Sequence, residues 1–131
     1  MIDFIDALKD YLVANTSLVF GTTLFIGNMP ETLQSIVVLS EPTSPKYQYE
    51  LGNKFAYAQK NITIRIRGTE VENVTRALAQ TVEDAIENLT DETLGAYYVS
   101  RGWFETPPYQ LDGTDNNNCY IYVGVYSAII K

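Results

Sequence analysis

The chain has 131 residues, of which 46% are hydrophobic, and its formal net charge is −7 with no histidine. This length and apolar content predict one domain over residues 1–131, while the acidic balance argues against a surface built to grip phosphates. The absence of histidine excludes Ser-His-Asp and Cys-His nucleophiles. The single cysteine, Cys119, excludes an intrachain disulfide, and together these counts exclude a zinc site with four Cys or His ligands. We therefore expect no cofactor and no metal.

The first part of the chain predicts one helix and two short strands. Apolar residues recur at helical spacing from Ile5 to Leu12, which predicts an amphipathic helix over residues 2–15. A short strand is expected at residues 22–27. The continuous apolar run at residues 35–40 is too short for a buried helix, so it predicts a strand that is buried on both faces.

Aromatic side chains gather in residues 41–59, namely Tyr47, Tyr49, Phe55 and Tyr57. They lie on either side of a Gly-Asn pair, a pattern that predicts a hairpin or a projecting loop. Two interpretations stay open. The aromatic residues fold back onto the domain, or they form an arm that packs on a partner subunit, where tyrosine and phenylalanine are favoured.

Residues 60–67 give the clearest strand, because isoleucines alternate with polar residues. One face of this strand is expected to meet the core. The other face carries Arg65 and Arg67, which project the same way.

A long amphipathic helix is predicted over residues 70–89. Thr69 and Glu72 have the spacing of a capping box at its start. Its apolar stripe, expected to face the core, consists of Val71, Val74, Leu78, Val82, Ala85, Ile86 and Leu89.

The C-terminal part predicts two strands. Residues 96–105 form a strand that Pro107 and Pro108 end, residues 110–118 form a turn-rich loop, and residues 119–130 form the last strand. Both faces of the last strand are apolar or aromatic, so its second face is covered either by other elements of the chain or by another subunit. The two faces carry Ile121, Val123, Val125 and Ile129 on one side and Tyr120, Tyr122, Tyr126 and Ile130 on the other.

These elements predict an α+β domain of two layers. Their order is α-β-β-β-α-β-β, and two helices can cover one face of a mixed, mainly antiparallel sheet. The apolar stretches are too short to span a membrane, and the N-terminus lacks the pattern of a targeting segment, so we expect no membrane partner.

Acidic residues cluster near the end of the long helix and in the last loop. Helical spacing puts only some of Glu83, Asp84 and Glu87 on one side, which favours a solvated helix end over a metal site. No pattern indicates a buried carboxylate. Asp112 and Asp115 lack the spacing of a calcium loop, so a solvated turn is the better interpretation.

A basic face is the remaining candidate site. Arg65, Arg67 and Arg101 could bind nucleic acid. The stacking platforms would be Tyr97, Tyr98, Trp103 and Phe104. Because the chain is acidic overall, a structural role is favoured, in which the arginines pair with carboxylates of a neighbouring subunit.

The element order resembles that of phage tail terminator (tail completion) proteins. Related neck proteins, such as head–tail joining and minor capsid-type proteins, share a similar size and element order. The resemblance covers nearly the whole chain and rests on three parts: the N-terminal helix, the passage ITIRIRGTEVENVTRALAQTVEDAIENL and the end TPPYQLDGTDNNNCYIYVGVYSAII. In this family an alternating strand ends in Arg-Gly before a long helix, as at Arg67 and Gly68 here. The family's L-G-x-D loop has a counterpart with one extra residue at 111–115.

The resemblance implies a virion structural protein with no enzymatic activity. Such proteins form a ring, commonly a hexamer, that caps the tail tube, stops tail polymerisation and offers a surface to the head–tail connector. DNA passes through the lumen without specific binding. The implied location is the tail–head junction, after assembly in the host cytoplasm.

From residue type we predict a subunit or tail interface on the arm and on the sheet. Its residues are Tyr47, Tyr49, Phe55, Tyr57, Arg65, Arg67, Arg101 and Trp103. Two alternatives remain open at this stage. One is a head–tail joining or head-completion neck protein, and the other, of a different class, is a single-stranded nucleic-acid-binding module.

Overall fold

The computed structural model describes residues 4–27, 33–41, 46–48, 57–87, 89–95, 97–114 and 118–130. Over these residues the chain forms two helices and seven strands. In chain order they are α1 (Phe4–Asn15), β1 (Leu24–Ile26), β2 (Ile36–Ser40), β3 (Lys46–Gln48), β4 (Tyr57–Arg67), α2 (Glu72–Ile86), β5 (Thr90–Leu94), β6 (Tyr97–Thr114) and β7 (Tyr120–Ile130).

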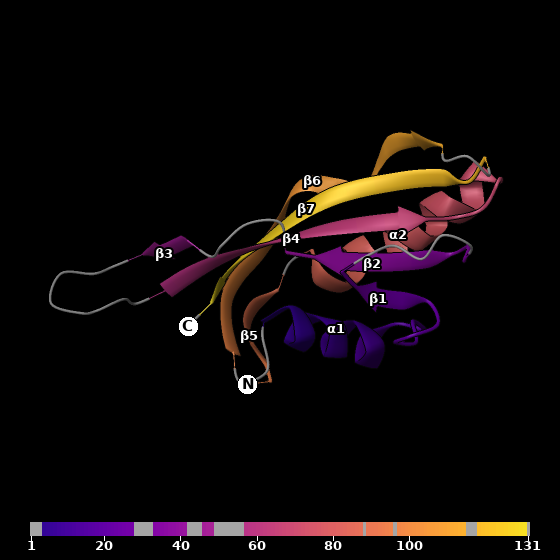
Figure 1. The fold of residues 1–131 in the computed structure, drawn as a ribbon. Helices are drawn as coiled ribbons and strands as arrows, with labels where there is room; N and C mark the ends of the chain where they lie inside the picture. The colour runs from indigo at the N-terminus through magenta and orange to yellow at the C-terminus, as the bar shows by residue number, and fades with distance from the viewer. Residues whose placement is uncertain are drawn as a thin grey trace, which may run out of the picture.

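The strands form one mixed sheet in the order β1-β2-β4-β7-β6-β5, with β3 paired to β4 (Figure 1). Only the β1–β2 pair is parallel among the described pairs, and the others are antiparallel. Buried side chains of α1 and α2 belong to one cluster with Ile64 and Tyr126 of the sheet, so both helices cover the same face. The predicted α+β fold of two layers is confirmed.

The core forms over the pair of long central strands, β4 and β7. Ile62, Ile64 and Ile66 of β4 are fully buried, as the alternating pattern predicts. In the β4–β7 register, Ile62 lies beside Tyr126 and Ile66 beside Tyr122, and both tyrosines are buried. Burial of each such isoleucine contributes roughly 1.5–3 kcal/mol to folding.

The N-terminal helix has the predicted orientation. Phe4, Leu8 and Leu12 of α1 are fully buried, and the Phe4 ring meets Tyr97 edge to face with centroids 5.8 Å apart. The helix ends where the hydroxyl of Thr16 donates to the carbonyl of Leu12 at 2.6 Å. The backbone N–H of Thr16 donates to the same carbonyl at 2.9 Å, so Thr16 closes the last turn of the helix with two bonds.

The second helix begins later than the sequence predicted, at Glu72, and the capping box is absent. Val71 occupies the N-cap without a side-chain hydrogen bond. The hydroxyl of Thr69 instead accepts the Val71 N–H at 3.0 Å, and the Thr75 hydroxyl accepts the Thr69 N–H at 3.2 Å. The first bond holds the Thr69 side chain in a tight turn before the helix, and the second ties the Thr69 backbone to the first helical turn.

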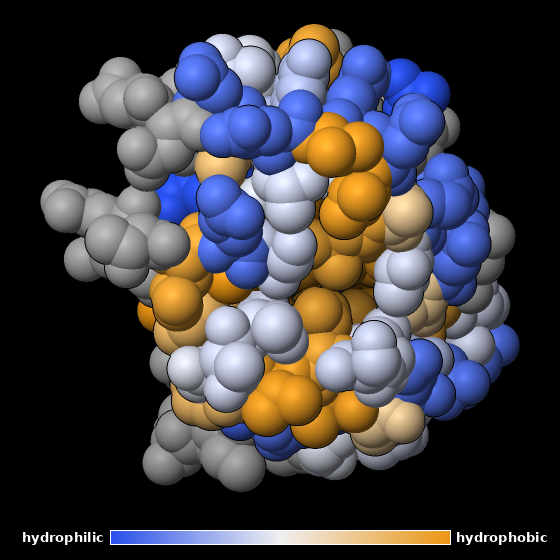
Figure 2. All heavy atoms as spheres, turned by 90° about the vertical axis from the view of Figure 1, so that its right-hand side faces the viewer, coloured by the Kyte–Doolittle hydropathy of each residue, from blue (hydrophilic) through white to orange (hydrophobic). Residues whose placement is uncertain are grey.

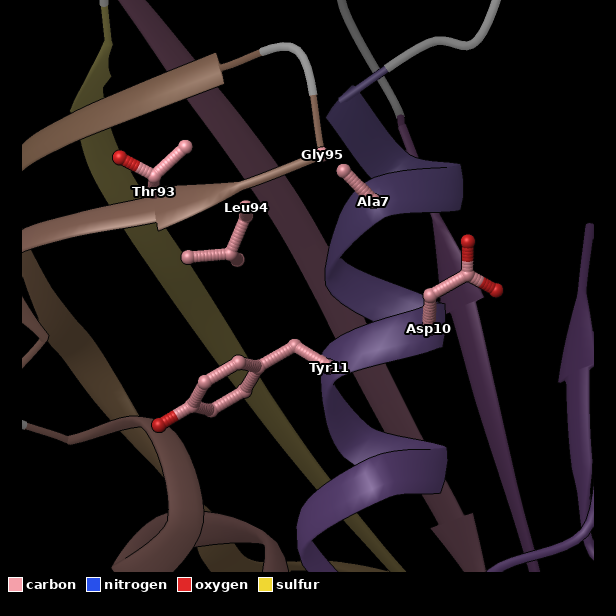
Figure 3. Close-up of a pocket in the computed structure, with 6 residues that line it drawn as sticks. All are labelled: Ala7, Asp10, Tyr11, Thr93, Leu94 and Gly95. Carbon is pink, nitrogen blue, oxygen red and sulfur yellow. The ribbon is translucent and has the colours of Figure 1, made fainter.

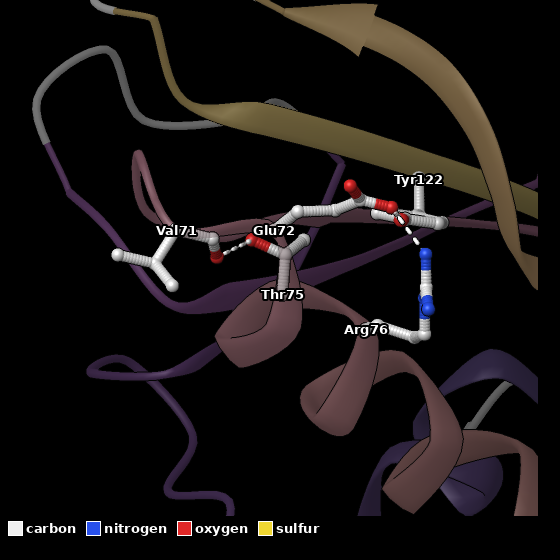
Figure 4. Close-up of polar contacts among 5 residues, drawn as sticks. All are labelled: Val71, Glu72, Thr75, Arg76 and Tyr122. Carbon is white, nitrogen blue, oxygen red and sulfur yellow. Dashed lines mark hydrogen bonds and ion pairs between the residues drawn. The ribbon is translucent and has the colours of Figure 1, made fainter.

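Close packing at Gly68 fixes the helix to the sheet. A Cβ at Gly68 would lie 1.7 Å from the Thr75 hydroxyl oxygen, so only glycine fits. Figure 4 shows the polar contacts at the start of α2, where the Tyr122 hydroxyl donates to Glu72 at 3.1 Å and Arg76 pairs with the same carboxylate. Helix α2 is thus held by its first turn against β7.

This anchoring turns the helix away from the predicted apolar stripe. Thr75, Ala79 and Glu83 are buried, whereas Val71 and Val74 are exposed. Leu78 and Ala85 are half-buried beside the core, and Val82, Ile86 and Leu89 are buried as expected. The predicted apolar stripe was therefore wrong for Val71 and Val74, which do not face the core. The contact between Gly68 and Thr75, rather than apolar content, sets the rotation of the helix.

The C-terminal half contains more strand than predicted. Residues 90–94, expected to end the helix, form β5 at the sheet edge, where four of five side chains are exposed and only Leu94 is buried. Strand β6 continues through Pro107 and Pro108 to Thr114, so the strand end and the loop start at residue 110 were wrong. The prolines are tolerated because β5 pairs no further than Arg101 and the β6–β7 register shifts between Thr106 and Gln110.

The segment at residues 41–59 is described in part. Strand β3 pairs with the start of β4, with Lys46 beside Gln59 and Gln48 beside Tyr57, which is the backbone pairing of a hairpin base. The residues between lie outside the described part of the chain.

We predict that Gly68→Ala lowers the free energy of unfolding by about 1–3 kcal/mol, since the added methyl overlaps Thr75 and one of the two segments must shift. Chemical denaturation monitored by circular dichroism measures the loss. Thr81→Ala, which places an alanine on an exposed position of the same helix, is the control and should change stability by under about 0.5 kcal/mol. Equal stability of Gly68→Ala and the wild type would contradict the close contact.

Candidate interaction surfaces

The four sheet residues predicted for an interface lie on one face. In the register, Arg65 lies beside Val123, Arg67 beside Ile121, and Arg101 beside Ile129. These positions alternate with the core-facing residues of the same strands, so they project away from the helices. We call this side the outer sheet face; it carries Arg65, Arg67, Arg101, Trp103, Ile121, Val123, Val125 and Ile129.

The cations of the outer sheet face differ in their contacts. The Arg101 guanidinium lies over the Trp103 ring, 5.8 Å from its centroid, a stacking contact that orients both side chains. Arg67 donates from Nη1 to the carbonyl of Leu33 at 3.4 Å. Arg65 is exposed and forms no ion pair with the part of the chain that the structure describes.

An aliphatic strip runs along β7 on the outer sheet face. Ile121, Val123, Val125 and Ile129 are half-buried and lie outside the core cluster, which takes Tyr122, Tyr126, Ala128 and Ile130 from the same strand. Neither α1 nor α2 covers the strip, because both helices pack on the other face. The face that the sequence expected to be covered is therefore partly open in the single chain.

The predicted aromatic arm is not placed as a whole. Tyr49 and Phe55 lie outside the described residues, and for Tyr47 and Tyr57 the structure describes the backbone alone, in the β3–β4 pair. Their role at an interface stays a prediction, as does that of Arg65, Arg67, Arg101 and Trp103.

A second exposed surface, which the sequence did not predict, lies at one end of the molecule. Figure 2 shows apolar side chains gathered in the middle of this end, bordered by hydrophilic ones. Three segments meet there: the turn after α1, the segment before β2 and the start of α2. Their exposed apolar residues are Val19, Phe20, Leu33, Val71 and Val74. We call this surface the apolar end.

Backbone contacts bring the three segments of the apolar end together. Ser35 donates from its N–H to the carbonyl of Gly68, just before α2, and Val37 donates to the carbonyl of Thr23, just after Phe20. Val71 is 55% exposed and Phe20 is 51% exposed. A gathering of apolar side chains from separate segments is typical of an interaction site. The adjacent Val19 and Phe20 in a turn were the available sequence signal.

Among the described residues no group of three or more His, Cys, Asp or Glu comes together as a metal site. A shallow pocket of about 220 Å³ lies between α1 and the turn after β5. Figure 3 shows Tyr11 directed from α1 beneath Leu94, while the Asp10 carboxylate points away from that strand. One carboxylate beside apolar walls offers no paired acid and base for hydrolysis.

One carboxylate of α2 is buried, contrary to the expectation from the sequence. Glu83 is 5% exposed, and its Oε2 has no hydrogen-bond partner among the described residues. Burial raises the pKa of the Glu83 carboxyl, and the neighbouring carboxylates of Glu87 and Asp84 raise it further. The rotation of α2 set by Gly68 brings Glu83 to the buried side.

The model of a family described as bacteriophage tail terminator protein matches residues 11–131. The chain belongs to the bacteriophage tail terminator family. Tail terminators are structural proteins, so the chain is a structural component of a phage tail and its place is in the virion.

A solved structure shares the fold of this tail terminator. It is a chain from a "Virion of native gene transfer agent (GTA) particle", with a TM-score of 0.65 at 18% sequence identity. The similarity covers 94% of this chain and 90% of that chain. A comparison with curated proteins gave no match. No helix in the described ranges is long and apolar enough to cross a membrane.

We predict that Glu83→Gln raises the free energy of unfolding near neutral pH by roughly 1–3 kcal/mol, because it removes a desolvated charge that lacks a partner. The folded-state pKa of Glu83 lies above its ordinary value of 4.5. The wild type therefore gains stability as the pH falls through that raised pKa, and the gain is complete below about pH 4.5. The advantage of Glu83→Gln should shrink over the same interval.

Denaturant unfolding at several pH values between neutral and acid measures this difference. Glu92→Gln is the control, since Glu92 is exposed on β5 and is not among the carboxylates that raise the pKa of Glu83. An advantage of Glu83→Gln that does not change with pH would contradict a buried, ionised Glu83.

Proposed function

We propose that this chain forms a closed ring, a hexamer, that caps the phage tail tube, stops tail polymerisation and presents the surface on which the head is joined. Its partners are further copies of itself, the tail tube protein and the head–tail connector. Its location is the tail–head junction, after assembly in the host cytoplasm. Membership in the tail terminator family supports the capping role.

The outer sheet face is the observation that carries the proposal. Two helices cover one side of the sheet, while the other side carries a half-buried aliphatic strip, the half-buried Trp103 and the exposed Arg65 and Arg101. Tryptophan and arginine dominate the energetics of protein interfaces, and partly exposed aliphatic residues between them favour a protein partner. The face therefore supports binding to other protein subunits rather than chemistry.

The charge of the subunit supports the passage of DNA. The net charge is −7 per chain, and a ring multiplies it. An acidic wall repels phosphates, so DNA can slide through the lumen without specific binding. The non-enzymatic role rests on family membership and on the single carboxylate of the described pocket.

Polymerisation of the tail tube protein tests the proposal. We expect added wild-type protein to stop tube growth and to be visible as a cap on tube ends in electron micrographs. Trp103→Ala should require roughly tenfold more protein for the same effect, since truncation of an interface tryptophan costs more than about 1 kcal/mol. Thr81→Ala, on an exposed helix position, is the control and should cap as the wild type does.

Tubes that elongate unhindered by the wild-type protein would overturn the capping role. Binding to DNA-filled heads in the same preparation would then support a head–tail joining or head-completion protein instead.

A single-stranded nucleic-acid-binding module is the second candidate, favoured by one observation. Arg101 lies beside Trp103, and Arg65 is exposed on the same face, so this face combines cations with an aromatic ring, the two kinds of group that bind single strands. Retention on immobilised single-stranded DNA that falls steeply with salt would support it. Failure to bind at low salt would exclude it.

A further inference from the structure

We propose that the apolar end of one subunit packs on the outer sheet face of the next, so that each copy uses two different surfaces in self-association. This inference rests on the proposed ring and names the two surfaces that meet. It commits to a second copy of this chain as the partner of both surfaces.

The two surfaces belong to different sides of the molecule. The apolar end lies where α2 and β2 begin, at the right of Figure 1 and facing the viewer in Figure 2. The outer sheet face extends along β4, β7 and β6, opposite the helices. A symmetric dimer through either surface would leave the other surface open. A contact between the two kinds of surface covers both, and repetition of that contact gives a ring when the rotation closes.

The apolar parts of the two surfaces match in chemistry. Val71, Val74 and Phe20 supply exposed aliphatic and aromatic groups at the end. Val123 and Val125 supply half-buried aliphatic groups on the sheet. Contact between them would remove apolar surface of both partners from water, which is the main favourable term in association.

The charges favour contact between unlike surfaces. Glu70, the residue before Val71, is exposed and has no ion-pair partner among the described residues. On the sheet, Arg65 is exposed beside Val123 and is likewise without an ion-pair partner in the described part of the chain. Sheet against sheet would bring arginines of two copies together. End against end would bring together two ends of the same charge pattern, each with Glu70 and with a Lys9 ammonium that lies over the Phe20 ring and is paired with Asp10. End against sheet brings opposite charges together, and such complementarity sets which surfaces pair.

Cysteine cross-linking tests the pairing. Val74→Cys labels the apolar end, and Val123→Cys labels the outer sheet face; the native Cys119 is buried and leaves the wild type as an unreactive reference. The two variants are treated separately and mixed, with a short bismaleimide, in free solution and on isolated tail tubes. Circular dichroism first checks that each variant is folded.

We expect at least about tenfold more cross-linked dimer in the mixture than in either variant alone, because a specific contact holds the two thiols at a high effective concentration. The chain that carries both substitutions should give a ladder of covalent oligomers. A Thr93→Cys chain mixed with Val123→Cys is the control for random collision, since Thr93 is exposed on the edge strand β5 and belongs to neither surface. That mixture should give only the background level.

The pairing would be overturned if Val74→Cys alone or Val123→Cys alone gave as much cross-linked dimer as the mixture. That result would indicate a symmetric contact. Background cross-linking in the mixture, both free and on tubes, would also overturn it. The capping assay separates this inference from the proposed function. Capping by the wild type without the mixed cross-link would refute the pairing alone, and the cross-link without capping would refute the capping role alone.

Discussion

The register between β4 and β7 is the constraint on which the rest of the structure depends. Ten residue pairs join these strands, from Ala58 beside Ile130 to Arg67 beside Ile121. Because side chains alternate between faces, a slip of one residue would exchange the buried isoleucines for arginines and threonines. The same register therefore decides which residues form the core and which form the outer sheet face, so the two properties cannot change separately.

The position of α2 follows from its contact with the end of β4. Gly68 allows Thr75 to lie directly over the backbone, and Glu72 meets Tyr122 of the neighbouring strand. A second glycine has a similar role in β6, where a Cβ at Gly102 would lie 1.8 Å from the Tyr126 hydroxyl oxygen. Close approach at these glycines fixes the rotation of the helix and the position of the Tyr126 ring.

That rotation has an energetic cost and a structural consequence. It buries Glu83, whose desolvated carboxylate has a raised pKa, and it leaves Val71 and Val74 in solvent. Neither position is favourable for the isolated chain, since a buried charge and exposed valines both cost free energy. Exposed valines cost little when a neighbouring subunit covers them, which fits the subunit of an assembly better than a monomer.

The sequence by itself determined the periodic elements and the class of the fold. Local pattern was sufficient to predict three elements. These are the strand with alternating isoleucines at 62–66, the helix α1 with its apolar spacing, and the strand with the continuous apolar run at residues 36–39. The sequence also proposed that Arg65, Arg67 and Arg101 share one basic face, and the register places them on the same side of the sheet, while their role at an interface stays a prediction. Tertiary structure alone decided the rest. The contact at Gly68 set the rotation of α2, and sheet pairing made strands of residues 90–94 and 110–114. Separate segments met at the apolar end. The sequence pattern did not predict these features, because each depends on contacts between residues far apart in the chain.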